Sequence, residues 1–228
     1  YELATNWRLT HEAYKLSVLK RDSELLNLLG IKDIAIFGPS YYDISGDQVI
    51  QREKNDFEQS AKRMPEEVDP ISLPGWLLRG ASREDDWTGI NLPGCQVTAE
   101  NPQDDPYADP PDRPKNHFYD PYYNRALAVL GVALGEKAPD WSLGTTDIFG
   151  SPNGENASRR NHFTVFDARE AMYRALTGKT KNNTDAGPCN QPATESHRKA
   201  YWATLFRALG DIVHLVQDMG QPQHTRND

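Results

Sequence analysis

The sequence has few hydrophobic residues and no long apolar run. Only 37% of its 228 residues are hydrophobic and the mean hydropathy is -0.74. The core must therefore be modest for the length, with long polar loops around it. No run approaches the roughly 18 apolar residues that a membrane-spanning helix needs, so we expect no membrane span. The length suits a single domain over residues 1–228.

Cysteines are also scarce. Cys95 and Cys189 both lie in segments rich in glycine, proline and asparagine. Cysteines in loops fill a core poorly, so one disulfide formed in an oxidising compartment and two free thiols are both open interpretations. The sequence begins at Tyr1 without a signal peptide, as a mature exported chain and a cytosolic one both would.

The sequence lacks an excess of basic residues. It has 33 acidic and 25 basic residues, which gives a net charge of -8. An acidic surface repels polyanions, so we expect no stable complex with nucleic acid. The acidic excess fits ordinary solubility, and it also fits carboxylates gathered to hold cations.

Apolar spacing predicts helices, and clear strands and internal repeats are missing. We therefore expect an all-α fold, a single multi-helix domain with long irregular loops, present as a monomer. Segments 88–116 and 137–161 have no apolar period and are predicted to be loops. The predicted helices cover residues 7–30, 51–68 (charged and solvated), 124–134, 166–176 and about 195–219.

The last predicted helix carries the strongest chemical pattern. His214 and Asp218 lie four residues apart, which places both side chains on one helix face. An imidazole and a carboxylate so placed can bind one cation. The chain turns after Gly220 and Pro222, so His224 can fold back toward the same site. The pair by itself equally fits a buried histidine that is hydrogen-bonded to an aspartate.

The string His-Leu-Val-Gln-Asp-Met-Gly-Gln-Pro-Gln-His, residues 214–224, closely resembles the metal motif of the zinc-dependent phospholipase C family and of the related single-strand-specific nucleases. Those proteins carry His-x-x-x-Asp-x-x-x-Pro-x-His at this spacing. The resemblance implies a phospholipase C/nuclease-like helical fold, up to three bound zinc ions, and a secreted or periplasmic protein.

The resemblance also implies ligands near the N-terminus. In the family the first residue binds zinc through its own amine and carbonyl, and Tyr1 stands here where the family has Trp. The string Thr-His-Glu-Ala around His11 resembles the Thr-His-Ala of alpha-toxin-type members. Asn6, at the position where the nucleases have His, is a poor zinc ligand, so His11 is the implied ligand. The alternative for His11 is an exposed position in the first helical turn.

Two mid-chain ligands follow from the same resemblance. The acidic run after Gly80 supplies an Asp, for which we prefer Asp85 to Asp86, and a His-Phe-Tyr-Asp-Pro string supplies His117. His162 has a similar context but no acidic partner upstream, so it ranks second. His197, near a helix start, is expected to be exposed.

The implied sites divide these residues among three zinc ions. The family completes the third site with a later His-x-x-x-Glu or His-x-x-x-Asp, which this sequence lacks. Either the sequence is truncated at its C-terminus or the third site is incomplete. The implied ligands are Asp85, His117, His214 and Asp218 for the first ion, Tyr1, His11 and Asp218 for the second, and His224 for the third.

The resemblance implies phospholipase C-like hydrolysis of a phosphodiester, by water whose pKa zinc lowers to about 7. Asp85 is the candidate base. The implied substrate is a phospholipid or other phosphodiester, with peripheral membrane contact. A single-strand nuclease, a metal-stabilised binding domain without turnover, and a helical domain without metal are the alternatives. The aromatic residues that could stack on bases or enclose choline are Trp87, Tyr107, Tyr119, Tyr122 and Tyr123.

Overall fold

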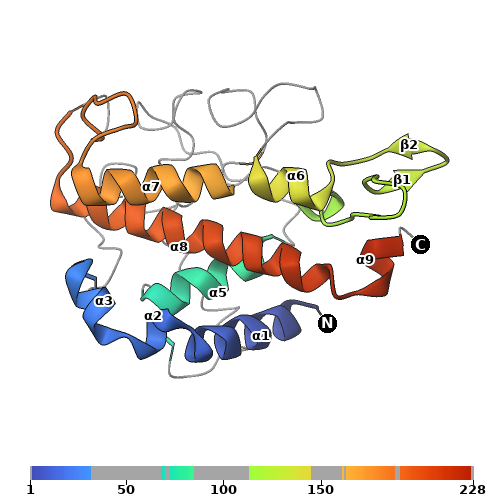
Figure 1. Ribbon diagram of the computed structural model, residues 1–228, viewed down its shortest axis with the longest axis horizontal. Coiled ribbons are helices and arrows are strands. Elements are labelled where there is room, and N and C mark those ends of the chain that lie inside the picture. Colours follow the sequence, from blue (N-terminus) through green and yellow to red (C-terminus); the bar gives the residue numbers. More distant parts are fainter. Residues whose placement is uncertain are drawn as a thin grey trace, which may run out of the picture.

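The computed structural model describes residues 2–31, 68–69, 72–84, 113–144, 161, 163–187 and 191–226, and this part of the chain is mostly helical (Figure 1). None of the helices described is both long and apolar enough to cross a bilayer. The elements are α1 (Glu2–Leu16), α2 (Val18–Arg21), α3 (Ser23–Leu28), α5 (Leu73–Arg83), the 3-10 turn η3 (Arg113–Asn116), β1 (Ala128–Val129), β2 (Val132–Ala133), α6 (Ala138–Leu143), α7 (Val165–Thr177), α8 (Glu195–Asp218) and α9 (Pro222–Arg226).

Helix α8 is the central element, and it packs against α7 and α5 (Figure 1). It begins with a capping box, in which Thr194 accepts from the His197 backbone N–H and the His197 side chain accepts from the Thr194 N–H. Thr164 forms an equivalent capping box at the start of α7. The predicted helices over 195–219 and 166–176 are confirmed.

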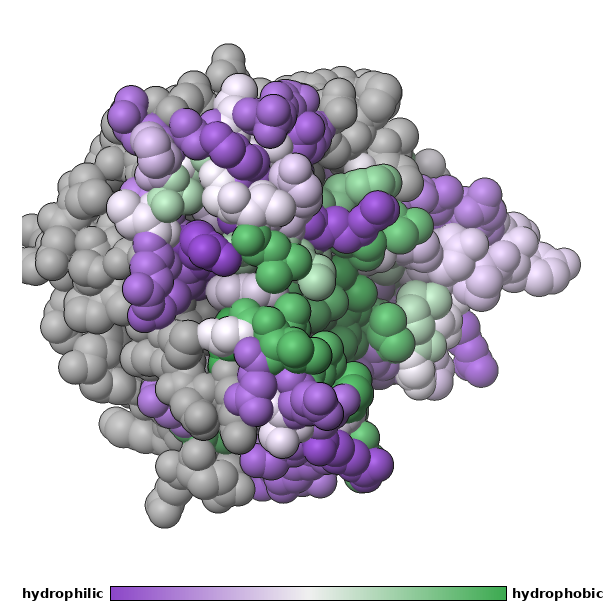
Figure 2. All heavy atoms as spheres, turned by 60° about the vertical axis from the view of Figure 1, so that its left-hand side comes forward, coloured by the Kyte–Doolittle hydropathy of each residue, from purple (hydrophilic) through white to green (hydrophobic). Residues whose placement is uncertain are grey.

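The main core cluster joins α5, α7 and α8. Trp76 of α5 and Phe206 of α8 are both buried in it, together with small residues of α7 such as Ala171. Some hydrophobic residues that pack against this cluster, including Leu26 and Leu29, are only partly buried. Figure 2 shows an apolar area in the middle of one face, bordered by hydrophilic side chains.

Two glycines allow α5 and α8 to touch through their backbones. A Cβ atom added at Gly80 would lie 2.0 Å from the Arg207 carbonyl oxygen, and one added at Gly210 would lie 2.1 Å from the Leu77 carbonyl oxygen. Any side chain at either position would therefore separate the helices. This close crossing fixes the distance between the end of α5 and the second half of α8.

The first part of the chain differs from the single helix predicted over 7–30. Helix α1 begins earlier, at Glu2, and ends at Leu16. Asp22 then starts α3, because its side chain accepts from the backbone N–H groups of Glu24 and Leu25. The predicted single helix is therefore wrong, because the chain forms three separate helices here. Polar residues that cap helices interrupt the apolar spacing between them.

The helix predicted over 124–134 is wrong. Strands β1 and β2 pair antiparallel, and Leu130 and Gly131 connect them with φ values of 52° and 82°. Two consecutive positive φ values are typical of a type I′ hairpin turn. A short apolar run does not distinguish helix from strand by spacing alone, and Gly131 makes the turn possible.

Two short helices were not expected. Helix α5 starts at the Ser72 cap, and α6 lies inside the loop predicted over 137–161. Both helices have a proline in the first turn, where proline favours the start of a helix. In the sequence alone the same proline suggests a loop, so these helices were missed. Except for Val68, the helix predicted over 51–68 falls outside the described residues, as do both cysteines.

Candidate metal centre

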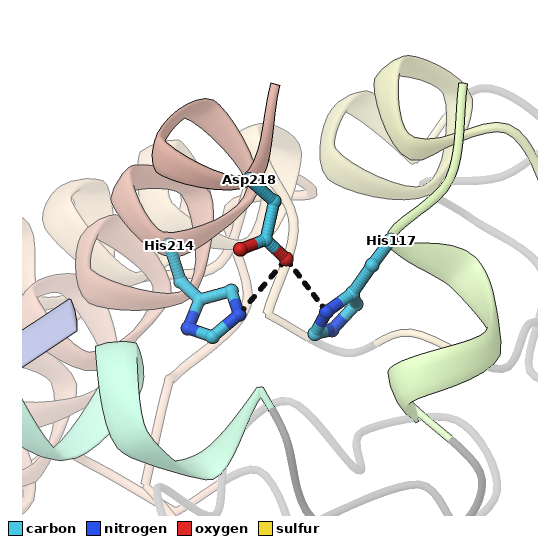
Figure 3. A group of neighbouring side chains, drawn as sticks. All are labelled: His117, His214 and Asp218. Atoms are coloured by element: carbon cyan, nitrogen blue, oxygen red, sulfur yellow. Dashed lines mark ion pairs between the residues drawn. The ribbon is translucent and has the colours of Figure 1, made fainter. Parts of the chain in front are cut away.

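Four of the sequence-predicted ligands lie together at the C-terminal end of α8. His214 and Asp218 come from α8 itself, His117 from the segment after η3, and His224 from α9 (Figure 3 shows the first three). All four side chains are buried. The donor atoms of His117, His214 and Asp218 lie within 4.8 Å of one another, and this is the group of metal-donor side chains found among the described residues.

Local structure explains how His117 and His224 reach the C-terminal end of α8. After Asp218 the chain turns at once, because Gln221 N–H donates to the Asp218 carbonyl (2.8 Å) and His224 N–H donates to the Gln221 carbonyl (3.1 Å). Tyr119 N–H then donates to the His224 carbonyl (2.9 Å), which ties the segment of His117 to α9. The turn from Asp218 to Gln221 therefore positions His224, and the Tyr119 hydrogen bond to His224 then positions the segment of His117.

One carboxylate oxygen lies at the centre of the cluster. Asp218 Oδ2 is 2.8 Å from His117 Nδ1, 3.1 Å from His214 Nε2 and 3.3 Å from His224 Nδ1 (dashed lines in Figure 3 mark the first two). Each contact is an ion pair when the imidazole is protonated, but none has the alignment of a hydrogen bond, so Asp218 Oδ2 and His224 Nδ1 lack a hydrogen-bond partner among the described residues. Such buried orphan atoms require an explanation.

Backbone carbonyls fix the tautomers of two histidines. His214 Nδ1 lies 2.6 Å from the Ala81 carbonyl oxygen, and His117 Nε2 lies 3.0 Å from the Glu84 carbonyl oxygen. A carbonyl oxygen only accepts, so these two contacts favour the tautomers in which His214 Nδ1 and His117 Nε2 carry the protons. In the neutral rings, the lone pairs of His214 Nε2 and His117 Nδ1 then face the Asp218 carboxylate. A cation between them would turn this repulsion into coordination, as in metal sites whose histidines donate to a carbonyl.

The close packing of these ionisable side chains shifts their pKa values. Burial opposes protonation of His117, but the nearby Asp218 and Glu84 carboxylates outweigh it and raise its pKa to about 10. Burial likewise disfavours the charged form of Asp218, yet His117, His214 and His224 hold the pKa of its carboxyl well below the usual range. Without a metal, His117 is therefore protonated, and its positive charge balances the Asp218 carboxylate as a bound divalent ion would.

A buried ionic network lies next to His117 Nε2, the ring nitrogen that does not face Asp218. Glu84 accepts from Arg113 Nε (2.9 Å) and Trp141 Nε1 (2.7 Å), and its Oε1 is 3.6 Å from His117 Nε2. Burial raises the pKa of Glu84, but Arg113 and His117 outweigh it and bring it to about 2. Arg113 also lies 3.3 Å from Asp211 of α8. Apart from the acidic run that contains Glu84, no pattern in the sequence predicts this network.

Helix α1 lies along the same part of α8. The Asn6 amide nitrogen is 3.0 Å from His214 Nδ1, and Gln217 donates to the Thr10 hydroxyl at 3.0 Å. His11 is buried, so the exposed alternative is wrong, but His11 is not in the compact group of donors. Asn6, set aside as a ligand, contacts the ring of His214 instead.

The remaining predicted residues have other outcomes. Tyr1, Asp85, Asp86 and His162 lie outside the described residues. His197 is half-buried rather than exposed, because its ring accepts the hydrogen bond that caps α8.

Comparisons with protein-family models, curated proteins and solved structures find no match for this chain. The chemical interpretation therefore depends on the cluster. Imidazole nitrogens and one carboxylate, buried and close to one another, are a donor set that could hold a divalent metal ion.

Proposed function

We propose that this chain is a zinc-dependent hydrolase of phosphodiesters, with a phospholipase C/nuclease-like helical fold. One observation carries the proposal: two histidines, each held by a backbone carbonyl, direct their other ring nitrogen at a buried aspartate oxygen. Histidine nitrogens and a carboxylate form the usual donor set of catalytic zinc sites. The 214–224 string, whose spacing resembles that of the phospholipase C and nuclease motif, adds the reaction class.

Zinc bound here would lower the pKa of a water ligand to about 7 and so supply hydroxide at neutral pH. His117, His214 and Asp218 would hold the ion, and the Ala81 and Glu84 carbonyls orient the rings. Glu84 and Arg113 keep His117 in place from the interior. Asp85, which follows Glu84 in the sequence, remains the proposed base and a further ligand.

Further ions extend the proposal. His224, 3.3 Å from Asp218 Oδ2, would begin a neighbouring site, and Tyr1 with His11 would form another. Such neighbouring ions would neutralise the negative charge on the oxygens of a bound phosphodiester. We propose an exported monomer that acts on phospholipids.

The direct test combines zinc content and turnover. Purified protein should contain at least one zinc per chain and hydrolyse a chromogenic phosphocholine ester, and dialysis against a chelator should abolish the activity. Asp218→Asn should lose both zinc and turnover, because the central oxygen donor loses its charge. Asp185→Asn, at a half-exposed carboxylate paired with Lys179 in a loop, is the matched control and should retain both. A zinc-free parent protein would reject the proposal.

A single-strand nuclease is the second candidate. Tyr122 and Tyr123 are 84% and 65% exposed, and their rings lie 4.7 Å apart, so bases could stack on them. The net charge of -8 opposes binding of a polyanion. Lecithin and single-stranded DNA assayed side by side would decide between the two substrates. Zinc without turnover on either would support a metal-stabilised binding domain.

A further inference from the structure

The hairpin of residues 126–135, called here the apolar hairpin, exposes aliphatic side chains that a folded chain normally buries. Its ten residues are alanine, leucine, valine and glycine alone. Leu130 at the turn is 99% exposed, and Val132 and Val129 are 64% and 52% exposed. The turn also places Leu130 at a positive φ of 52°, a conformation that asparagine or glycine adopts more easily. Turn formation alone therefore does not explain a leucine at this position.

The apolar hairpin is joined firmly to the metal centre. It projects past the C-terminal end of α8, at the same end of the molecule as α9 (Figure 1). At its base, Asp120 and Arg125 exchange backbone hydrogen bonds, and Glu136 N–H donates to the Asn116 side chain, next to His117. Whatever surface receives the hairpin is thus held near the proposed site of hydrolysis.

The side chains at the base of the hairpin resemble those that proteins place at a membrane–water interface. Tyr122 and Tyr123 are exposed there, and tyrosine is enriched where apolar tails meet head groups. The two cations at this base are paired, Arg125 with Asp120 (3.0 Å) and Lys137 with Asp140 (3.0 Å). An apolar tip above two exposed tyrosines and two paired cations matches a zwitterionic surface, since paired cations add little attraction for anionic lipid.

A second copy of the chain fits this feature less well. A stable protein–protein interface buries about 1,200–2,000 Å². A convex hairpin with strands of two residues each presents only a few aliphatic side chains. A fluid lipid surface closes around a convex tip, whereas a protein partner would need a matching cavity.

We propose that the apolar hairpin is a membrane-docking element, which inserts its tip into a zwitterionic phospholipid surface and brings the metal centre to lipid substrate. The inference rests on the proposed hydrolase for its substrate, but the docking itself requires no metal. It favours phospholipid over nucleic acid as the substrate class.

Vesicle flotation of the full chain, with metal chelated, tests the docking. The parent protein should float with phosphatidylcholine vesicles, and phosphatidylserine should not be required. Leu130→Asn combined with Val132→Thr should reduce the bound fraction about tenfold or more, because two exposed apolar side chains are lost. The double variant should remain folded, since asparagine suits the turn and threonine suits a strand. The matched control is Leu28→Asn, at a leucine of α3 that is 80% exposed, and it should bind as the parent does.

Three results would overturn the proposal: a parent that stays unbound, a double variant that binds equally well, or binding that depends on anionic lipid. A parent dimer that becomes monomeric in the double variant, without vesicle binding, would assign the hairpin to self-association instead. A separate measurement of hydrolysis distinguishes the docking from the proposed enzyme activity. The double variant should cleave a soluble phosphocholine ester at the parent rate and vesicle phosphatidylcholine more slowly. Hairpin-dependent flotation without any hydrolysis would reject the hydrolase and leave the docking intact.

Discussion

Replacement of Gly80 by alanine tests how the helix crossing supports the metal centre. The new Cβ would lie 2.0 Å from the Arg207 carbonyl oxygen and 2.8 Å from the Asp211 nitrogen, whereas ordinary contacts begin near 3.4 Å. Helices α5 and α8 must then separate by on the order of 1 Å, since both obstacles are backbone atoms. The Ala81 carbonyl, one residue further along α5, would move away from His214 Nδ1, which it now meets at 2.6 Å.

The expected loss of stability combines two opposing effects. Overpacking costs about 1–3 kcal/mol, with the upper end expected against rigid backbone, and alanine gains about 1 kcal/mol over glycine inside a helix. We expect a net destabilisation of about 2 kcal/mol, or a Tm lowered by about 4–8 °C in a domain of this size. Zinc affinity should fall by about 10–100-fold, as expected when the group that orients a ligand histidine is displaced.

Urea unfolding with metal chelated measures the stability term, and competition with a chromophoric chelator measures zinc affinity. Gly220→Ala is the control, because its Cβ would lie 3.1 Å from the Gln217 carbonyl, a tight contact without overlap. This variant should change stability by no more than about 0.5 kcal/mol. A Gly80→Ala protein as stable as the parent, with unchanged zinc affinity, would refute the direct backbone contact and its role in placing His214.

Three further outcomes are expected. Glu84→Gln should destabilise the protein by about 3 kcal/mol in urea unfolding, because Arg113 loses a buried charged partner, and a change near zero would contradict this. Thr194→Ala should cost about 1 kcal/mol by the same measurement, through loss of the α8 cap. Burial lowers the pKa of His197, whose neutral ring accepts the Thr194 N–H. Its contribution to stability is therefore present above the usual histidine pKa and lost as pH falls through the lowered value, and a His197→Asn variant should show a flatter dependence between pH 7 and 5 in thermal melts.

Local patterns identified the parts of the fold that depend on neighbours in sequence. Helices α7 and α8 follow from apolar spacing over many turns and from residues that cap helices well. The pair His214 and Asp218 follows from the helical repeat, which places residues four apart on one face. Spacing was ambiguous for short segments, so the apolar hairpin was predicted to be a helix and α6 a loop.

The partners of that pair depend on packing between distant segments. His117 reaches Asp218 because the Tyr119 N–H is bonded to the His224 carbonyl, and no sequence spacing encodes that contact. The tautomer of His214 is set by a carbonyl of another helix. Resemblance to a metal motif could name these residues as ligands, but only the folded chain shows which nitrogen of each ring faces the carboxylate.

The sequence by itself therefore determined a mostly helical chain, its two long C-terminal helices, and one helix face that carries an imidazole and a carboxylate. The tertiary structure decided what surrounds that face: the close glycine crossing, the carbonyls behind the rings, the buried Glu84–Arg113 pair and the exposed hairpin. The reason is physical, because helical periodicity is a property of adjacent residues, while burial and tautomer depend on groups brought together only when the chain is packed.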